Sequence, residues 1–210
     1  MDPRRLLLGD WAPWCRDGID VARYALPLVG VVLLVTGGPA GVVLLVLGAA
    51  AVAARFALLP RLVDLGLVSA LWLQSLTEAF GLYDTVDWVD RVIHVVFPLL
   101  CAPALYVALA RLDVVPDPKD FSGTRHLVGM GIVTFALGLA VGAVWEVYEM
   151  SSDALLGTEL SESNADTVGD LVADAVGSAL GALVLVQWTR HHWGSVRRIP
   201  GVNTHEEVDA

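Results

Sequence analysis

The chain is short of charged residues. They make up 17% of its 210 positions, against 56% for hydrophobic residues, and the mean hydropathy is +0.65. Soluble domains carry about 25% charged and roughly 45–50% apolar residues. The deficit excludes an ordinary soluble surface and makes the lipid bilayer the expected solvent and partner. The simplest expectation is a single membrane domain over residues 1–198, followed by a polar tail over residues 199–210.

Basic residues and cysteines are especially scarce. Only 13 Lys and Arg accompany 23 Asp and Glu, so the net charge is −10 and the pI is about 4.7. We therefore expect no nucleic-acid partner, because phosphate binding requires clustered Lys and Arg. The two cysteines, Cys15 and Cys101, belong to no CxxC or Cys/His spacing, so we expect no disulfide.

Long apolar stretches are abundant instead. A spanning helix needs about 20 predominantly apolar residues. Six stretches qualify: 18–36, 40–59, 62–82, 89–110, 126–150 and 167–189. Within the first, Arg23 sits one turn from the end and is expected to snorkel towards the interface.

The basic residues set the orientation. Apart from Arg23 and Arg91, which lie within stretches, they precede the first stretch, flank the links 55–61 and 111–125, and follow the sixth stretch, so the positive-inside rule puts every basic cluster on the cytoplasmic side. The sequence thus predicts an all-α polytopic membrane protein, a six-transmembrane-helix bundle with both N- and C-termini cytoplasmic. Its expected location is the inner or plasma membrane of the cell.

Carboxylates concentrate where a membrane protein should have few. Eight lie between Arg125 and Arg190, with no Lys or Arg among them. At about 100° per residue, helical phase groups the polar residues on three faces. These faces are Asp87, Asp90, Arg91 and His94; Glu146, Glu149 and Asp153; and Asp166, Asp170 and Asp174. The predicted topology puts all three faces in the outer half, directed to the extracytoplasmic side.

Charge within a span is costly unless it is paired, hydrated or neutralised. Either a divalent metal ion binds here, or some carboxylates keep their protons. For Asp166 a structural role is also open, because acids near a helix N-terminus interact favourably with the helix dipole. The expected metal ligands are Asp90, His94, Glu149, Asp170 and Asp174. Because imidazole with several carboxylates suits Zn, Mn, Mg, Ca or Fe, the identity of the metal is left open.

Two residues are expected to act on a substrate. Glu146 would be the base for a water molecule activated by the metal, and Arg91 would orient a carboxylate or hold a substrate anion. Four further acids are expected to lie around the ligands without binding the metal directly: Glu78, Asp87, Asp153 and Asp166.

A family resemblance rests on motifs in a fixed order. They are Asp90-Arg91-x-x-His94, Trp145-Glu146-x-x-Glu149, Gly157-Thr158, and Asp166-x-x-x-Asp170-x-x-x-Asp174 with Gly177 and Gly181. Over about residues 60–190 the chain resembles the YjdF-like bacterial inner-membrane protein family. More distantly, it is similar to the VanZ-like proteins, which share an Asp-basic-x-x-His element and an acidic helix. The resemblance implies a polytopic membrane protein of unsettled activity and supports these site residues.

Three functions stay open at this point. The first is metal-dependent hydrolysis or group transfer on a lipid-linked or amphiphilic substrate. The second is a cation- or proton-coupled transporter that uses the same carboxylates, although the faces inward of His94 and Asp174 are mainly apolar. The third is a non-catalytic scaffold whose metal or ion-pair cluster pins the helices together. Whether the protein is an enzyme, which substrate it takes and its oligomeric state are not readable from the sequence.

Overall fold

The protein is described by a computed structural model over residues 15, 17–38, 40–86, 88–120, 123–157, 160–161 and 163–191. Within these ranges every regular element is helical and no strand occurs, which confirms the all-α expectation. The long helices are α2 (Gly18–Val35), α3 (Gly41–Ala54), α4 (Arg61–Ala79), α6 (Val89–Arg111), α7 (Thr124–Leu156) and α8 (Asn164–Arg190). The short ones are η1 (Arg55–Ala57), α5 (Leu82–Thr85) and η2 (Pro118–Asp120). The expected tail, 199–210, lies outside these ranges.

Several helices are suited to a bilayer. Among the described residues, α2, α6, α7 and α8 are long and apolar enough to cross a membrane. A shorter apolar helix runs from Gly41 to Ala57, and α4 has 19 residues but carries Asp64 and Glu78. The helices support a multi-pass membrane protein. Crossing by all six and the cytoplasmic placement of the termini stay predictions.

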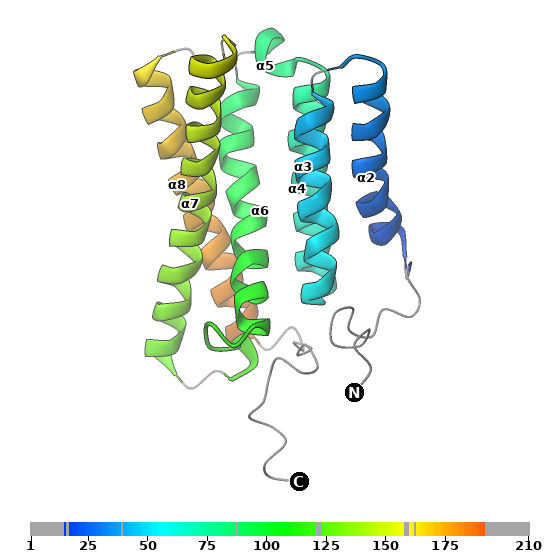
Figure 1. Cartoon of the computed structure of the whole chain (residues 1–210). Coiled ribbons are helices and arrows are strands. Elements are labelled where there is room, and N and C mark those ends of the chain that lie inside the picture. The colour runs from blue at the N-terminus through cyan, green and yellow to red at the C-terminus, as the bar shows by residue number, and fades with distance from the viewer. Residues whose placement is uncertain are drawn as a thin grey trace.

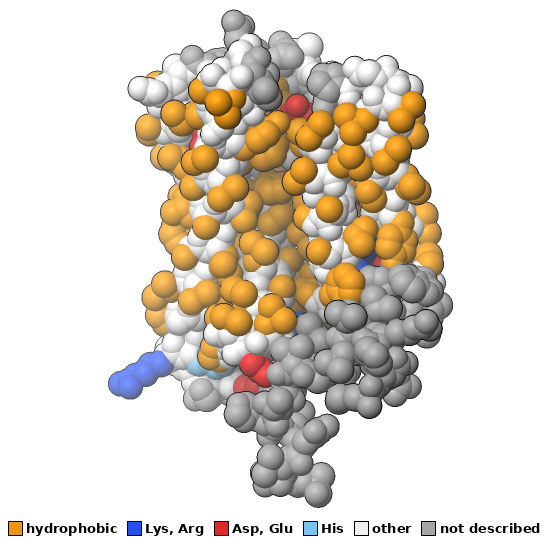
Figure 2. Space-filling model, in the orientation of Figure 1, with side chains coloured by type: hydrophobic (Ala, Val, Ile, Leu, Met, Phe, Trp, Pro, Cys, Tyr) orange, Lys and Arg blue, Asp and Glu red, His pale blue; other side chains and the backbone are white. Residues whose placement is uncertain are grey.

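The long helices stand side by side in one bundle (Figure 1). One end, called the α5 end here, contains α5, the start of α6, the end of α7 and the start of α8. Helices α6, α7 and α8 pack on one another and form one group. Helix α2 packs on α3 and α4 in a second group, and the contact between α4 and α6 joins the two groups. Hydrophobic side chains cover the flank shown in Figure 2, and the charged side chains visible there gather near the two ends.

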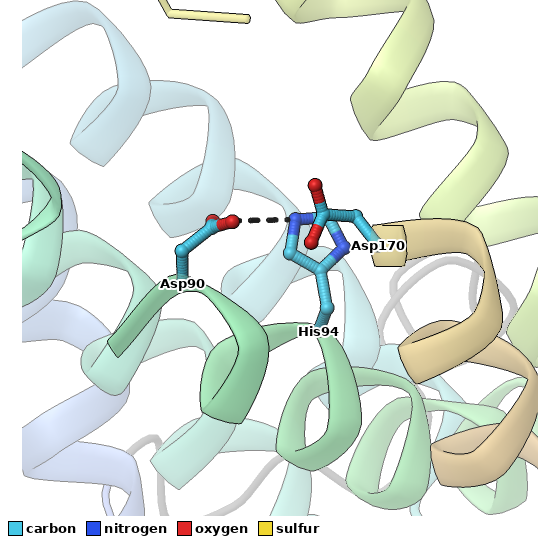
Figure 3. Close-up of side chains that lie close together, drawn as sticks. All are labelled: Asp90, His94 and Asp170. Atoms are coloured by element: carbon cyan, nitrogen blue, oxygen red, sulfur yellow. Dashed lines mark ion pairs between the residues drawn. The ribbon is translucent and has the colours of Figure 1, made fainter. Parts of the chain in front are cut away.

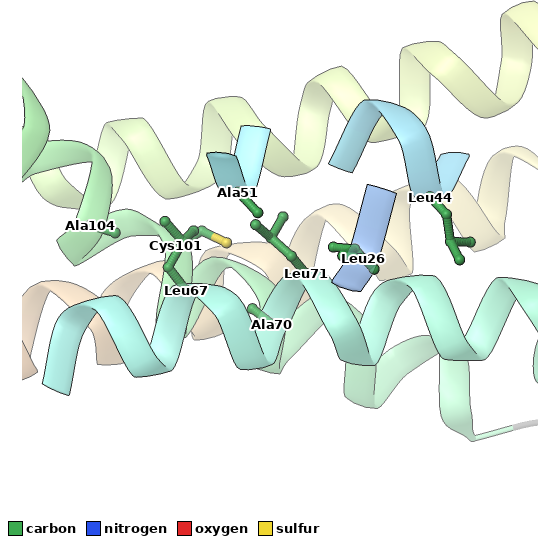
Figure 4. Packing of buried hydrophobic residues seen from close by; sticks show 8 residues of the cluster. All are labelled: Leu26, Leu44, Ala51, Leu67, Ala70, Leu71, Cys101 and Ala104. Atoms are coloured by element: carbon green, nitrogen blue, oxygen red, sulfur yellow. The ribbon is translucent and has the colours of Figure 1, made fainter. Parts of the chain in front are cut away.

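The core of the first group consists of small and branched side chains. Its buried members come from α2, α3, α4 and α6 (Figure 4): Leu26, Leu44, Ala51, Leu67, Ala70, Leu71, Cys101 and Ala104. Because lipid is as apolar as these side chains, their association is stabilised by close packing more than by removal from water. Cys101 is a free, buried cysteine and Cys15 is free and exposed, as expected without a disulfide.

Glycines bring α8 close to α6. A Cβ atom at Gly177 would lie 2.9 Å from Pro98 Cγ and still closer to the Val95 carbonyl oxygen, and one at Gly181 would lie 2.8 Å from the Leu99 carbonyl oxygen. Neither position has room for a larger residue. Small residues of this kind let membrane helices approach closely, and here they set the acidic N-terminal half of α8 against the polar start of α6.

Candidate metal centre

His94 is the buried centre of the polar cluster at the α5 end. Its Nδ1 atom lies 3.1 Å from Asp174 Oδ1 on α8. Its Nε2 atom lies 3.5 Å from Asp90 Oδ1, one turn earlier on α6, and 3.7 Å from Glu146 Oε1 on α7. One imidazole therefore meets carboxylates from three helices.

Asp170 completes a group with metal-binding geometry. Asp90, His94 and Asp170 each offer one ligand atom, and these atoms all lie within 4.8 Å of one another. Figure 3 shows Asp90 and His94 projecting from α6 towards the Asp170 carboxylate of α8. His94 and Asp170 are buried and Asp90 is half-buried. One nitrogen and two carboxylate oxygens form a donor set that suits several divalent ions.

Arg91 joins α6 to α8 at the edge of this cluster. Its Nε donates to Asp170 Oδ1 at 2.9 Å, and its Nη2 donates to Asp166 Oδ1 at 3.2 Å. The guanidinium lies over Gly169, where a Cβ would stand 2.7 Å from Arg91 Cζ. With half of its side chain exposed, Arg91 offsets two carboxylates and still reaches the surface of the bundle.

Two buried carboxylate oxygens of this cluster have no hydrogen-bond donor among the described residues. Glu146 Oε1 and Asp174 Oδ2 accept no hydrogen bond from any residue that the structure describes. Asp174 is 1% exposed and its carboxylate rests against Gly142 of α7, at a point where a Cβ would collide with it. Buried acceptors without donors are costly in proteins and commonly mark the place of an ion or a water molecule.

Three of the remaining expected residues are described, and none of them belongs to the group of three. Glu149 accepts a hydrogen bond from Trp145 Nε1 at 2.7 Å. Asp153 accepts from the backbone N–H groups of Leu160 and Ser161 at 2.8 and 2.9 Å, so it fixes the link between α7 and α8. Glu78 lies half-buried near the end of α4, apart from the group of three. Asp87 lies outside the described residues.

Sequence reasoning missed Tyr83 and Gly142. Tyr83, on α5, accepts a hydrogen bond from Gln74 Nε2 at 2.7 Å. Burial raises the pKa of the Tyr83 phenol, and the nearby charges of Asp90, Glu78 and Glu149 raise it further, against the effect of Gln74. A single Tyr in a short interhelical segment carries no pattern that points to a site. The role of Gly142 depends on which face of α7 meets Asp174, and the sequence does not contain that information.

Fold and cluster together define a multi-pass helical membrane protein with a polar centre between α6, α7 and α8. A family model described as predicted membrane protein (DUF2238) matches residues 26–191, a range that includes every residue of this centre. The chain belongs to this DUF2238 family. Comparison with curated proteins gave no match, and comparison with solved structures gave none either. The likeness to YjdF-like proteins stays a resemblance.

Proposed function

We propose that the cluster at the α5 end binds one divalent metal ion and supports hydrolysis or group transfer on a lipid-linked or amphiphilic substrate from the extracytoplasmic side. The observation that carries the proposal is the orientation of His94. Asp174 holds Nδ1, and Nε2 faces Asp90 and Glu146 at 3.5 and 3.7 Å. Both distances exceed those of ordinary N–H···O hydrogen bonds, which are about 2.7–3.2 Å.

The spacing matches a coordination sphere. With metal–ligand bonds of about 2.1 Å, neighbouring ligand atoms of a tetrahedral site lie about 3.4 Å apart. Metal-binding histidines usually donate their other ring N–H to a carboxylate, which fixes the tautomer. Asp174 is in that position at Nδ1. We therefore assign Asp90, His94 and Asp170 as ligands and Asp174 as the residue that orients His94.

The remaining residues have complementary tasks. A bound divalent ion would polarise a carbonyl or phosphoryl oxygen as a Lewis acid. Glu146, whose Oε1 accepts no hydrogen bond from the described residues, is placed to take a proton from an attacking hydroxyl group or water molecule. Arg91 orients Asp170 and presents a half-exposed guanidinium that suits an anionic substrate group.

The surroundings of the cluster favour an amphiphilic substrate. On α7 and α8, close in sequence to Glu146 and Asp170, three apolar side chains are largely exposed: Val147 (63%), Val168 (61%) and Val172 (60%). Exposed apolar side chains beside a polar centre allow a substrate to keep its apolar part in lipid while its polar group reaches Arg91. A transporter gains less support, because the buried hydroxyl groups of Thr134 and Thr189 donate to Met130 and add no polar path inward.

Elemental analysis of full-length protein, purified in detergent without chelator, tests the proposal. We expect about one equivalent of a divalent metal per chain, lost in Asp90→Asn and in Asp170→Asn because each removes a charged ligand. The matched control is Asp113→Asn, the same chemical change in a loop residue with a left-handed backbone that Asn tolerates. Equal metal content in all variants, or none in the unaltered protein after loading with Zn or Mn, contradicts the proposal.

A further inference from the structure

A second buried group of charges lies at the end of the bundle opposite to α5. Arg23 of α2 is 0% exposed, so the expectation that it snorkels to the interface is wrong. Its Nε lies 3.4 Å from Asp20 Oδ1, and its guanidinium also pairs with Asp64 of α4. Arg55 Nε lies 2.9 Å from the same oxygen of Asp20. Arg23 stays inside because two aspartates and a backbone carbonyl, that of Ala51, meet it there.

Asp20, Arg55 and Asp64 of this group line a cavity of about 210 Å³ between α2, η1 and α4. At its rim Arg61, the first residue of α4, is 74% exposed and lies 3.1 Å from Asp17. Leu58, on the wall, has a left-handed backbone with φ of 47°. A bulky residue rarely adopts this conformation, and such strain is found where the surroundings enforce it.

The charge of this group sums to zero. Its cations are Arg23, Arg55 and Arg61, and its anions are Asp17, Asp20 and Asp64. Arg23 does not line the cavity but pairs with Asp20 and Asp64 from behind its wall, so the group as a whole gives no net attraction to an anion or a cation alone. It fits a ligand that carries both signs, with the positive group towards an aspartate and the negative group towards the exposed Arg61.

An apolar groove continues from the cavity. It encloses about 460 Å³ between α2 and α4 and shares Ile19 and Arg61 with the cavity. Ala22, Leu65, Val68, Ser69 and Trp72 are among the residues that line it. Trp72 Nε1 donates to the Ala22 carbonyl at 2.9 Å, which ties α2 to α4 at the groove.

We propose that cavity and groove together bind one phosphatidylethanolamine-type phospholipid. Its phosphate would lie at Arg61, beside the positive end of the α4 dipole. Its ammonium group would donate to Asp17 or Asp64, and one acyl chain would lie along the groove between α2 and α4. The apolar groove decides against a small water-soluble zwitterion, which would leave it empty. The site is independent of the cluster at the α5 end.

Native mass spectrometry of the full-length protein with equimolar phosphatidylethanolamine, phosphatidylglycerol and phosphatidylcholine tests this site. We expect the ethanolamine lipid to be retained most, because phosphatidylglycerol lacks the cation and phosphatidylcholine has no N–H donor. Arg61→Gln should lower the retention of phosphatidylethanolamine by about tenfold, because it removes one hydrogen bond from a charged donor. Arg125→Gln, at an exposed arginine at the start of α7, is the control and should retain it fully.

A second variant separates the groove from the headgroup site. Ser69→Leu fills the groove without altering any charge and should also reduce retention of the lipid, whereas Asp170→Asn at the other end should not. Circular dichroism and melting temperature verify that each variant is folded. Equal retention of all three lipids, a preference for phosphatidylglycerol, or unchanged retention in folded Ser69→Leu would overturn the proposal. Binding of chain-free glycerophosphoethanolamine as tight as that of the lipid would also overturn it.

Discussion

Asp174 depends on side chains and backbone from two other helices. One of its oxygens meets His94 Nδ1 on α6, and the other rests against Gly142 on α7 without a hydrogen bond from the described residues. The carboxylate therefore has one position, and that position fixes the ring of His94. In the proposed metal centre Asp174 would act on the ion through the histidine.

Asp174→Asn should weaken metal binding without abolishing it. The amide keeps the shape of the side chain but accepts more weakly from His94, and loss of such an outer partner typically costs about 10–100-fold in metal affinity. Competition with a chromophoric chelator measures the change. Asp166→Asn is the control: its carboxylate, on the same helix, meets Arg91 at the edge of the cluster. Equal affinities of the two variants would contradict the orienting role of Asp174.

At this scale the sequence predicts residue types better than contacts. Helical phase alone brings Asp90 into line with His94, and Asp166 with Asp170 and Asp174. It does not tell which oxygen meets which nitrogen, because that depends on the rotation of α7 and α8 about their axes. Glu149 was expected to be a ligand, and the structure shows it bound to Trp145, four residues earlier on its own helix.

Among the helices, the contact between α6 and α8 determines whether the residues of the cluster meet. Gly177 and Gly181 allow the approach, and Arg91 and His94 then reach the aspartates of α8. In the sequence, Gly177 and Gly181 stand four residues apart in the sixth apolar stretch, a spacing of small residues that favours such a close approach. The lengths of the helices were less predictable: α7 continues to Leu156, where the sequence predicted an end at residue 150. Asp153 holds Leu160 and Ser161 in the link between α7 and α8, and a carboxylate that binds a loop resembles any other acid in the sequence.

Gly177→Ala should destabilise the protein. The added methyl group meets the Val95 carbonyl and Pro98, and overpacking of this kind costs about 1–3 kcal/mol. Metal content should fall as α8 moves away from α6. The matched control is Gly131→Ala on α7, where the new Cβ would make an ordinary contact of 3.5 Å with Val186. Melting temperatures in detergent measure the difference, and a Gly177→Ala variant as stable as Gly131→Ala would refute the packing argument.

The whole molecule consists of two groups of helices that are joined where α4 packs on α6. Each group holds its own buried charges: the α5 end of α6, α7 and α8 contains the carboxylate cluster, and the opposite end of α2, η1 and α4 contains the paired arginines and aspartates. The sequence indicated the first set because the acids between Arg125 and Arg190 have no Lys or Arg among them. The second set does not stand out in the sequence, because the charges of Asp20, Arg23, Arg55 and Asp64 cancel and these residues are spread over three segments.

Cysteine accessibility examines the predicted topology. Cys15 is exposed and precedes α2, whereas Thr85 is exposed on α5 at the other end of the bundle. If α2, α3 and α4 all cross the membrane, a membrane-impermeant maleimide should label Thr85→Cys on intact cells and Cys15 only after permeabilisation. Buried Cys101 serves as an internal control that reacts after unfolding. Labelling of both positions from one side would show that α3 or α4 does not cross.

The separation along the chain between the partners of the carboxylate cluster determines when the cluster is completed during synthesis. Arg91 precedes Asp170 by 79 residues, and His94 precedes Asp174 by 80. At about 5–20 residues per second, synthesis of these residues takes several seconds, so α6 is made several seconds before its partner helix α8. A nascent chain that stops before α8 leaves Arg91 without Asp166 and Asp170 and leaves His94 without Asp174, so these contacts exist only once the last helix has been made.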